Sequence, residues 1–225
     1  PIPTCILTNF ARNTGRRSDL LLCKNLLETG ATYQDLLMGD DTFACAVKYP
    51  KGLDRAAAFF APGRPDDEPI ETDVFFGPAG TGKTRAARLI APSAYLVAPP
   101  NVLGGPLWFD GYVDQTTLLI DEYQGWIPWS LLKVLLDPWY PMSTLQIKGG
   151  TMKARYQRVL ICSNVHPLRW HPRQTILQLR ALARRVTRCW ECQMDVWSRV
   201  DLNSVLDIWE AQVGPDNPIP DSATL

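Results

Sequence analysis

The chain has 225 residues, of which 46% are hydrophobic, and its 23 basic and 23 acidic side chains give a formal net charge of zero. This composition suits a medium domain with a small companion and provides ample material for a buried core. No apolar run approaches the roughly 20 residues that span a bilayer and no secretory signal opens the chain, so we expect an intracellular protein with no membrane partner.

The first sixty residues are typical of a small helical unit. Short helices, with turn residues that fit helix caps, are predicted over residues 18–29, 32–38, 41–49 and 53–60. Proline and charged residues then crowd residues 62–69, which favours an exposed connection between two units. We therefore expect a helical region over residues 1–62 and a linker over residues 63–72.

Beyond the linker, apolar runs alternate with helical ones. Buried strands are predicted over residues 74–76, 94–97, 118–120 and 159–162. Alternation of this kind is typical of an α/β fold, in which helices cover a mostly parallel sheet. We place this domain over residues 73–190, and we expect an acidic, proline-containing and partly disordered tail over residues 191–225.

A complete phosphate-binding loop connects the first predicted strand to a helical stretch. It reads Gly77, Pro78, Ala79, Gly80, Thr81, Gly82, Lys83 and Thr84. In such a loop, glycines let backbone N–H groups turn toward phosphates, and the helix N-terminus adds its positive dipole end. Lys83 is predicted to reach the β and γ phosphates, and Thr84 to offer its hydroxyl to Mg²⁺. The alternative is a glycine turn beside a solvated lysine, but the order of strand, loop and helix favours a nucleoside triphosphate site.

Two more predicted strands end in polar residues. The run 116–120 is followed by Asp121 and Glu122, and the run 158–163 by Asn164. Nucleotide sites of α/β proteins lie at the carboxyl edge of the sheet, where these strands end. We expect Asp121 to hold Mg²⁺, directly or through water, Glu122 to polarise the attacking water, and Asn164 to sense the γ-phosphate or that water. The alternative is that these residues only end exposed strands; the order of the three motifs favours a site.

The neutral total hides an uneven distribution of charge. Residues 139–190 contain ten basic residues and no acidic one, whereas residues 191–225 carry seven acids against the single base Arg199. The basic segment suits a nucleic-acid backbone or nucleotide phosphates, and the alternative is that it pairs with the acidic tail. Cys189 and Cys192 have the spacing of metal ligands, but a second pair is missing, so the signal for zinc is weak.

Taken together, these motifs resemble the superfamily 3 helicases, and most closely the ATPase part of the replication initiator (Rep) proteins of circoviruses and related small circular single-stranded DNA viruses. The resembling stretches are GPAGTGKT (77–84), WFDGY (108–112), LIDEYQGWIPW (119–129), KGGT (148–151), ICSN (161–164) and ALARR (181–185). Residues 17–20 resemble the start of the helical region that precedes the helicase in those proteins. The resemblance implies an AAA+-like P-loop NTPase fold preceded by a small all-helical oligomerisation domain, with ATP and Mg²⁺ as ligands.

The resemblance also implies assembly. Such proteins act as hexameric rings, so a homohexamer is expected, with the ATP site between subunits and an arginine of the neighbour completing it. Arg184 and Arg185 are the candidates. We prefer Arg185 slightly, although adjacent helical residues point about 100° apart and the sequence does not choose between them. The alternative is a pair of surface charges on a basic helix.

The stretch 145–155 resembles the hairpin with which these proteins grip single-stranded DNA in the ring channel. Two glycines suit a tight tip, and Lys148, Lys153 and Arg155 offer positive charge to phosphates. The alternative is an ordinary surface hairpin. Core or interface positions, rather than contacts with bases, are expected for the tryptophans Trp126, Trp129, Trp139 and Trp170.

For the activity, the resemblance implies ATP-dependent DNA unwinding during rolling-circle replication in the host nucleus. Complete Rep proteins also carry an N-terminal nuclease with a His-hydrophobe-His metal site, a pattern that neither His166 nor His171 has. An upstream nuclease domain is therefore expected as a partner if the chain is a fragment. Two alternatives stay open: a small-molecule P-loop kinase, and an inactive nucleotide-binding module that only self-associates.

Overall fold

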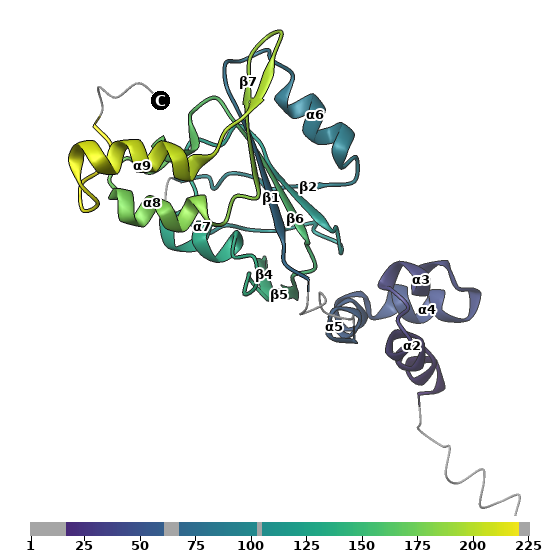
Figure 1. Cartoon of the computed structure of the whole chain (residues 1–225). Coiled ribbons are helices and arrows are strands. Elements are labelled where there is room, and N and C mark those ends of the chain that lie inside the picture. Colours follow the sequence, from purple (N-terminus) through teal and green to yellow (C-terminus); the bar gives the residue numbers. More distant parts are fainter. Residues whose placement is uncertain (1–16, 61–67, 103–104, 221–225) are drawn as a thin grey trace, which may run out of the picture. The chain divides into compact units, whose positions relative to one another are not determined.

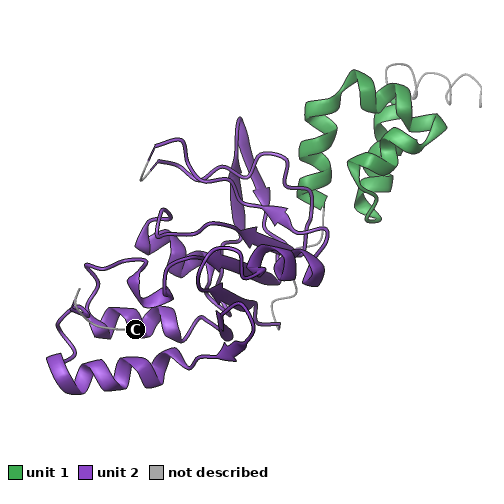
Figure 2. Cartoon of the chain, turned by 90° about the horizontal axis from the view of Figure 1, so that it is seen from above, with its two compact units in different colours: residues 1–62 green, residues 63–225 purple. Residues whose placement is uncertain are grey.

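The computed structural model describes residues 17–60, 68–102 and 105–220. Residues 1–62 and 63–225 form two compact units (Figure 2). Each unit has a hydrophobic core of its own. In the described ranges, no helix combines the length and the apolar character that crossing a membrane requires.

The described part of the first unit consists of four helices, as predicted. They are α2 (Ser18–Glu28), α3 (Tyr33–Met38), α4 (Asp40–Lys48) and α5 (Pro50–Phe60). Thr32 begins α3 with a capping box: its hydroxyl accepts from the Asp35 N–H, and the Asp35 carboxylate accepts from the Thr32 N–H. Leu27, Leu36 and Leu53 are among the buried side chains through which these short helices stabilise one another.

The second unit is built on a six-stranded sheet. Its strand order is β2 (Tyr95–Leu96), β3 (Thr117–Ile120), β6 (Arg158–Ser163), β1 (Glu71–Phe76), β7 (Arg188–Cys192) and β8 (Trp197–Arg199). The first five strands run parallel to their neighbours, and β8 is antiparallel to β7. The predicted mixed α/β fold with a mostly parallel sheet is confirmed, and β7 and β8 extend it beyond the predicted strands.

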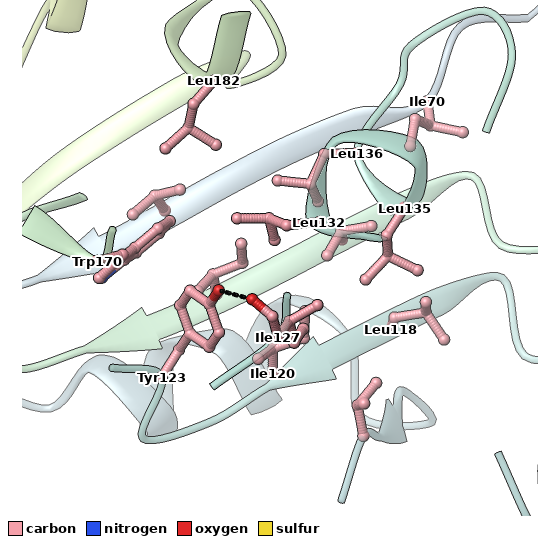
Figure 3. Packing of buried hydrophobic residues seen from close by; sticks show 14 of the residues in the cluster. Ile70, Leu118, Ile120, Tyr123, Ile127, Leu132, Leu135, Leu136, Trp170 and Leu182 are labelled. Carbon is pink, nitrogen blue, oxygen red and sulfur yellow. Dashed lines mark hydrogen bonds between the residues drawn. The ribbon is translucent and has the colours of Figure 1, made fainter. Parts of the chain in front are cut away.

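Helices cover both faces of this sheet (Figure 1). They are α6 (Lys83–Ile90), α7 (Trp129–Leu135), α8 (Ile176–Ala183) and α9 (Leu202–Val213). Successive side chains of a strand point to opposite faces. Val74 and Ile120 therefore face the larger core, shown in Figure 3, to which α7, α8 and α9 contribute. Phe75 and Leu119 face the other side, where Ala87 of α6 packs.

A separate antiparallel hairpin joins β4 (Thr144–Ile147) to β5 (Gly150–Lys153). Lys148 and Gly149 form its tip, and Gly149 has a φ of +88°, a left-handed conformation that glycine adopts without steric cost. The hairpin predicted from the sequence is confirmed.

The predicted acidic tail needs correction. Its boundary at residue 190 falls inside β7, and α9 buries Leu202 and Leu206 in the larger core of the second unit. The four-residue spacing of these leucines specifies a packed helix, whereas the acids before and after them gave the segment its tail-like composition. The predicted linker is also too long, because β1 begins at Glu71. Residues 61–67 and 221–225 lie outside the described residues.

Candidate functional site

The carboxyl ends of three adjacent strands meet at one edge of the sheet. β3, β6 and β1 are neighbours and parallel, so their ends point the same way. The loop 77–84 follows β1, Asp121 follows β3, and Asn164 follows β6. The structure thus brings the three predicted motifs together at the edge where α/β proteins bind ligands.

The loop requires glycine at its first position. Gly77 has a φ of +141°, and a Cβ there would lie 2.2 Å from the carbonyl oxygen of Cys192 on the neighbouring β7. Gly80 and Gly82 also have positive φ values, and Gly82 is the N-cap of α6. The loop therefore curves tightly into the N-terminus of α6, where backbone N–H groups and the helix dipole favour anions.

Lys83 is the first residue of α6, and its side chain bends back over the loop. The residue is buried, and its Nζ donates hydrogen bonds to the carbonyl oxygens of Gly77 (2.8 Å) and Pro78 (2.6 Å). The Thr81 hydroxyl donates to the same Pro78 carbonyl at 3.0 Å. The ammonium group is thus held inside the curve of the loop, where a phosphate oxygen would compete with these carbonyl oxygens for it.

Thr84 and Asp121 form a pair that links α6 to the end of β3. The Thr84 hydroxyl donates to Asp121 Oδ1 at 2.9 Å, and the Glu122 N–H donates to the same oxygen at 3.0 Å. A hydroxyl beside a carboxylate is a donor set that fits Mg²⁺, which usually takes few protein ligands and fills its other positions with phosphates and water. No cluster of three or more His, Cys, Asp or Glu side chains suited to a metal occurs in the described ranges, so an all-protein cage is not the arrangement found there.

Glu122 and Asn164 contact each other across the ends of β3 and β6. Asn164 Nδ2 donates a hydrogen bond to Glu122 Oε2 at 3.0 Å, and both residues are exposed. Glu122 has a φ of +50°. Among the described non-glycine residues, only Asp114 also has a positive φ. A glutamate in this sparsely populated region indicates that the surrounding contacts impose its position.

The two arginines at the end of α8 have different surroundings. The Arg185 guanidinium donates to the backbone oxygens of Lys133 (2.9 Å) and Ala181 (2.8 Å) and pairs with Asp137 at 2.7 Å. Arg184 is exposed, and its side chain makes no hydrogen bond or ion pair within the part of the chain that the structure describes. The geometry therefore favours Arg184, rather than the slightly preferred Arg185, as an arginine open to another molecule.

The three residues predicted to contact DNA are not equivalent. Lys148, at the hairpin tip, has a side chain that is 79% exposed although it lies 3.5 Å from Asp110. Lys153 ends β5. Arg155 follows the hairpin, has a 19% exposed side chain and pairs with Asp114 at 3.1 Å. The exposed Lys148 suits contact with a phosphate backbone, whereas Arg155 is engaged in the fold.

Much of the basic segment is neutralised within the second unit. Within the described residues, its ion pairs include Lys148 with Asp110, Arg155 with Asp114, Arg158 and Arg188 with Glu71 and Asp73, Arg180 with Asp207 and Glu210, and Arg185 with Asp137. Among these, only Arg180 pairs with acids from residues 191–220. The acidic partners thus come from several elements, and the alternative of pairing with residues 191–220 applies to Arg180.

Cys189 and Cys192 do not form a metal site. Residues three apart on a strand point to opposite faces, and Cys189 faces the larger core whereas Cys192 faces the core beside α6. Burial raises the pKa of the Cys189 thiol to about 12 and that of the Cys192 thiol to about 11. Both thiols are therefore protonated at neutral pH, and they point into two different cores.

Behind the Glu122–Asn164 pair lies a buried polar group that was not predicted from the sequence. Ser163 ends β6, and its hydroxyl lies within hydrogen-bonding distance of Tyr123, Val165 and Trp170. Trp170 is buried, as the sequence predicted, but it also has this polar partner. The available signal was a serine placed between an apolar strand and the candidate sensor asparagine.

The fold and this edge define a class of protein: a mixed α/β protein whose sheet is mostly parallel and whose glycine-rich loop is compatible with a P-loop fold. No protein-family model matches the chain.

Among curated proteins, the chain is similar to replication-associated proteins of circoviruses. The identity is 33% over 178 residues for Porcine circovirus 2, covering 78% of this chain and 54% of the relative. It is 32% over 177 residues for Porcine circovirus 1, with the same coverage, and 30% over 184 residues for Canary circovirus, covering 81% of this chain and 59% of the relative.

These similarities confirm the resemblance to circovirus Rep proteins: the chain is a homologue of the circovirus replication-associated proteins. It spans about half the length of these curated relatives.

Proposed function

We propose that this chain hydrolyses ATP with Mg²⁺ and uses the energy to move along single-stranded DNA, as the superfamily 3 helicase part of a circovirus-like replication initiator. The observation that carries the proposal is the meeting of Lys83, Thr84, Asp121, Glu122 and Asn164 at one edge of a parallel sheet. The name of the relatives, replication-associated protein, supports a role in the initiation of viral replication. Rolling-circle replication in the host nucleus stays a prediction from the resemblance.

The nucleotide phosphates would bind in the loop 77–84. There the backbone N–H groups and the N-terminus of α6 stabilise negative charge. Lys83 Nζ would exchange its bonds to the two loop carbonyls for bonds to phosphate oxygens. Mg²⁺, when bound, neutralises charge on the phosphates, and Thr84 and Asp121 are the residues that would hold it.

Glu122 would orient the attacking water. The hydrogen bond from Asn164 holds Glu122 Oε2 at the sheet edge. Glu122 follows β3, and β6 lies between β3 and β1, the strand that leads into the phosphate-binding loop. If the Asn164 amide donated its hydrogen bond to a γ-phosphate or a water instead, Glu122 Oε2 would be available to the attacking water. The pair would in this way link the state of the nucleotide to the state of the catalytic carboxylate.

An arginine of a neighbouring copy would complete the site, and we assign this role to Arg184. An arginine supplied in trans to a phosphoryl group in transfer is worth about 10³-fold or more in rate. Arg185 would hold the end of α8 through its bonds to α7 and to Asp137. Self-association is supported by the first unit, where Phe43 and Val47 lie one turn apart on α4 and are both more than half exposed.

Single-stranded DNA would contact the hairpin β4–β5 through Lys148 and Lys153. Such contacts are directed at phosphates and carry little information about base sequence. The chain contains two histidines and no His-hydrophobe-His pattern, so DNA nicking is not assigned to it.

Steady-state ATP hydrolysis and displacement of a labelled strand from a partial duplex test this proposal. The native chain is expected to need Mg²⁺ for hydrolysis, to hydrolyse faster with single-stranded DNA, and to displace the strand. Lys83→Ala is expected to lose about 10²-fold or more in turnover, because it removes a charge aimed at the transferred phosphate. Arg88→Ala, an exposed position on the same helix, is the matched control and should keep the native rate. Hydrolysis that ignores both DNA and Lys83→Ala would overturn the proposal.

A further inference from the structure

A buried serine joins the two loops that carry Glu122 and Asn164. Ser163 is 1% exposed, and its Oγ lies 2.7 Å from the carbonyl oxygens of both Tyr123 and Val165. The same Oγ accepts from the Val165 N–H and from the indole N–H of Trp170, each at 2.9 Å. We call these four residues, Ser163, Tyr123, Val165 and Trp170, the serine clamp.

The serine clamp has two side-chain donors, the Ser163 hydroxyl and the Trp170 indole N–H, for the carbonyl oxygens of Tyr123 and Val165. The hydroxyl has one proton for two carbonyl oxygens, while the indole N–H of Trp170 also reaches Val165 O at 3.2 Å. The Ser163 proton can therefore serve Tyr123 O while Trp170 serves Val165 O. Removal of the Ser163 hydroxyl would leave the Tyr123 carbonyl oxygen without this buried hydrogen bond, which is costly, and removal of the indole N–H would weaken the part-buried contact to Val165 O.

Packing around the clamp leaves little room for its two loops to shift. The Trp170 carbonyl oxygen lies 2.0 Å from where a Cβ on Gly125 would be, so the two backbones are in close contact. The rings of Tyr123 and Trp170 meet edge to face with centroids 4.7 Å apart, and both lie in the core shown in Figure 3. Tyr123 N–H also donates to Cys162 O at 2.9 Å, beside Ser163 on β6.

The clamp acts on the residues next to the candidate catalytic pair. Tyr123 directly follows Glu122, and Ser163 directly precedes Asn164. The hydroxyl therefore ties together the two peptide segments from which the Glu122 and Asn164 side chains extend toward each other. The positive φ of Glu122 is the conformation that these contacts impose.

We propose that Ser163 and Trp170 are positioning residues that hold Glu122 and Asn164 in register for the attack of water on the nucleotide. This role rests on the proposed ATP hydrolysis. Neither residue needs to touch the nucleotide, because a small displacement of the water-orienting carboxylate is enough to slow the reaction.

Two variants test the proposal, and each has a control. Ser163→Ala removes the hydroxyl, and Trp170→Phe keeps an aromatic ring but removes the indole N–H. Both are expected to lower kcat for ATP by about 10-fold to 100-fold while the KM and the Kd for Mg²⁺ and ATP stay within about twofold, because the loop 77–84 is unchanged. Ser163→Thr, which keeps a hydroxyl, should recover part of the rate. Tyr156→Phe is the matched control for a lost buried hydrogen bond, since its hydroxyl donates to Leu135 O at 2.9 Å in the same core.

Two readouts separate positioning from general loss of structure. Nucleotide-binding stoichiometry gives the folded, binding-competent fraction, to which each kcat is normalised. Amide hydrogen exchange is the second readout, and we expect faster exchange over residues 121–126 and 164–170 in Ser163→Ala than in Tyr156→Phe. An unchanged normalised kcat in both clamp variants, or an equal loss in Tyr156→Phe, would overturn the positioning role. A native chain without ATP hydrolysis would overturn the proposed function instead, and the exchange comparison alone would then decide whether the clamp holds the two loops.

Discussion

Gly77 and Gly80 of the phosphate-binding loop both have positive φ values, but their surroundings differ. At Gly77, a Cβ would collide with the Cys192 carbonyl oxygen on β7. At Gly80, a Cβ would have no heavy atom within 4 Å. The first glycine is therefore required by packing against the sheet as well as by its backbone conformation, and the second by backbone conformation alone.

This difference predicts unequal costs for the same substitution. Gly77→Ala is expected to lower the free energy of unfolding by about 2–4 kcal/mol, because backbone strain and a clash with a fixed carbonyl add. Gly80→Ala should cost only about 1–2 kcal/mol, the strain of the left-handed region. Urea unfolding of both variants measures the difference. Equal losses would show that the contact with Cys192 does not constrain the loop.

Some residues of the candidate site could be predicted from the sequence, and others could not. Lys83, Thr84, Asp121, Glu122 and Asn164 were predictable because each directly follows or lies within a local pattern of strand, loop and helix. The choice between Arg184 and Arg185 was not, since it depends on Asp137, 48 residues from Arg185 in the sequence. The bonds of the Ser163 hydroxyl likewise join segments whose contact only the folded sheet creates.

At the scale of elements, an ion cluster connects the three central strands at the end opposite the candidate site. Glu71 and Asp73 of β1 pair with Arg158 of β6 and Arg188 of β7. The Asp73 side chain is buried, so its two arginine partners compensate a charge that would otherwise be costly.

Glu71 gives the cluster a pH dependence with a defined sign. Hydrogen bonds from Arg158 and then Arg188 lower its pKa below the ordinary value of 4.5. A depressed folded pKa means that the stabilisation is present above that ordinary value and is lost as pH falls through the folded pKa. Glu71→Gln is therefore expected to lower the free energy of unfolding at about pH 6 and to lose most of this effect near about pH 3. Urea unfolding at both pH values tests this, and a difference between native and variant that is the same at both would contradict it.

The elements that were predictable are those with one dominant pattern. The strands buried on both faces are continuous apolar runs, and the helices of the first unit are separated by turn residues. β7 was missed because Arg188 and Glu191 interrupt its apolar pattern, although Arg188 is satisfied by Asp73 inside the unit. α9 was hidden by its acids, of which Asp207 and Glu210 pair with Arg180 of α8.

In the whole molecule, an exposed apolar surface and the candidate nucleotide site belong to different units. The first unit exposes apolar side chains on its helices, including Met38, Phe43, Val47 and Phe59. The second holds the candidate nucleotide site and, at the end of α8, the exposed Arg184. A site that takes its arginine from another copy explains why an exposed arginine and an apolar, self-associating surface would occur in the same chain.

The most direct measurement is steady-state ATP hydrolysis, with single-stranded DNA present, by a mixture of Glu122→Gln and Arg184→Ala chains. Each variant alone should be nearly inactive, because every site would lack either the water-orienting carboxylate or the neighbour's arginine. In an equal mixture, a site with Glu122 from one copy and Arg184 from the next forms at about one quarter of the interfaces of a randomly assembled ring, so we expect about one quarter of the native turnover. A mixture that is no more active than the separate variants would contradict a nucleotide site shared between neighbouring copies.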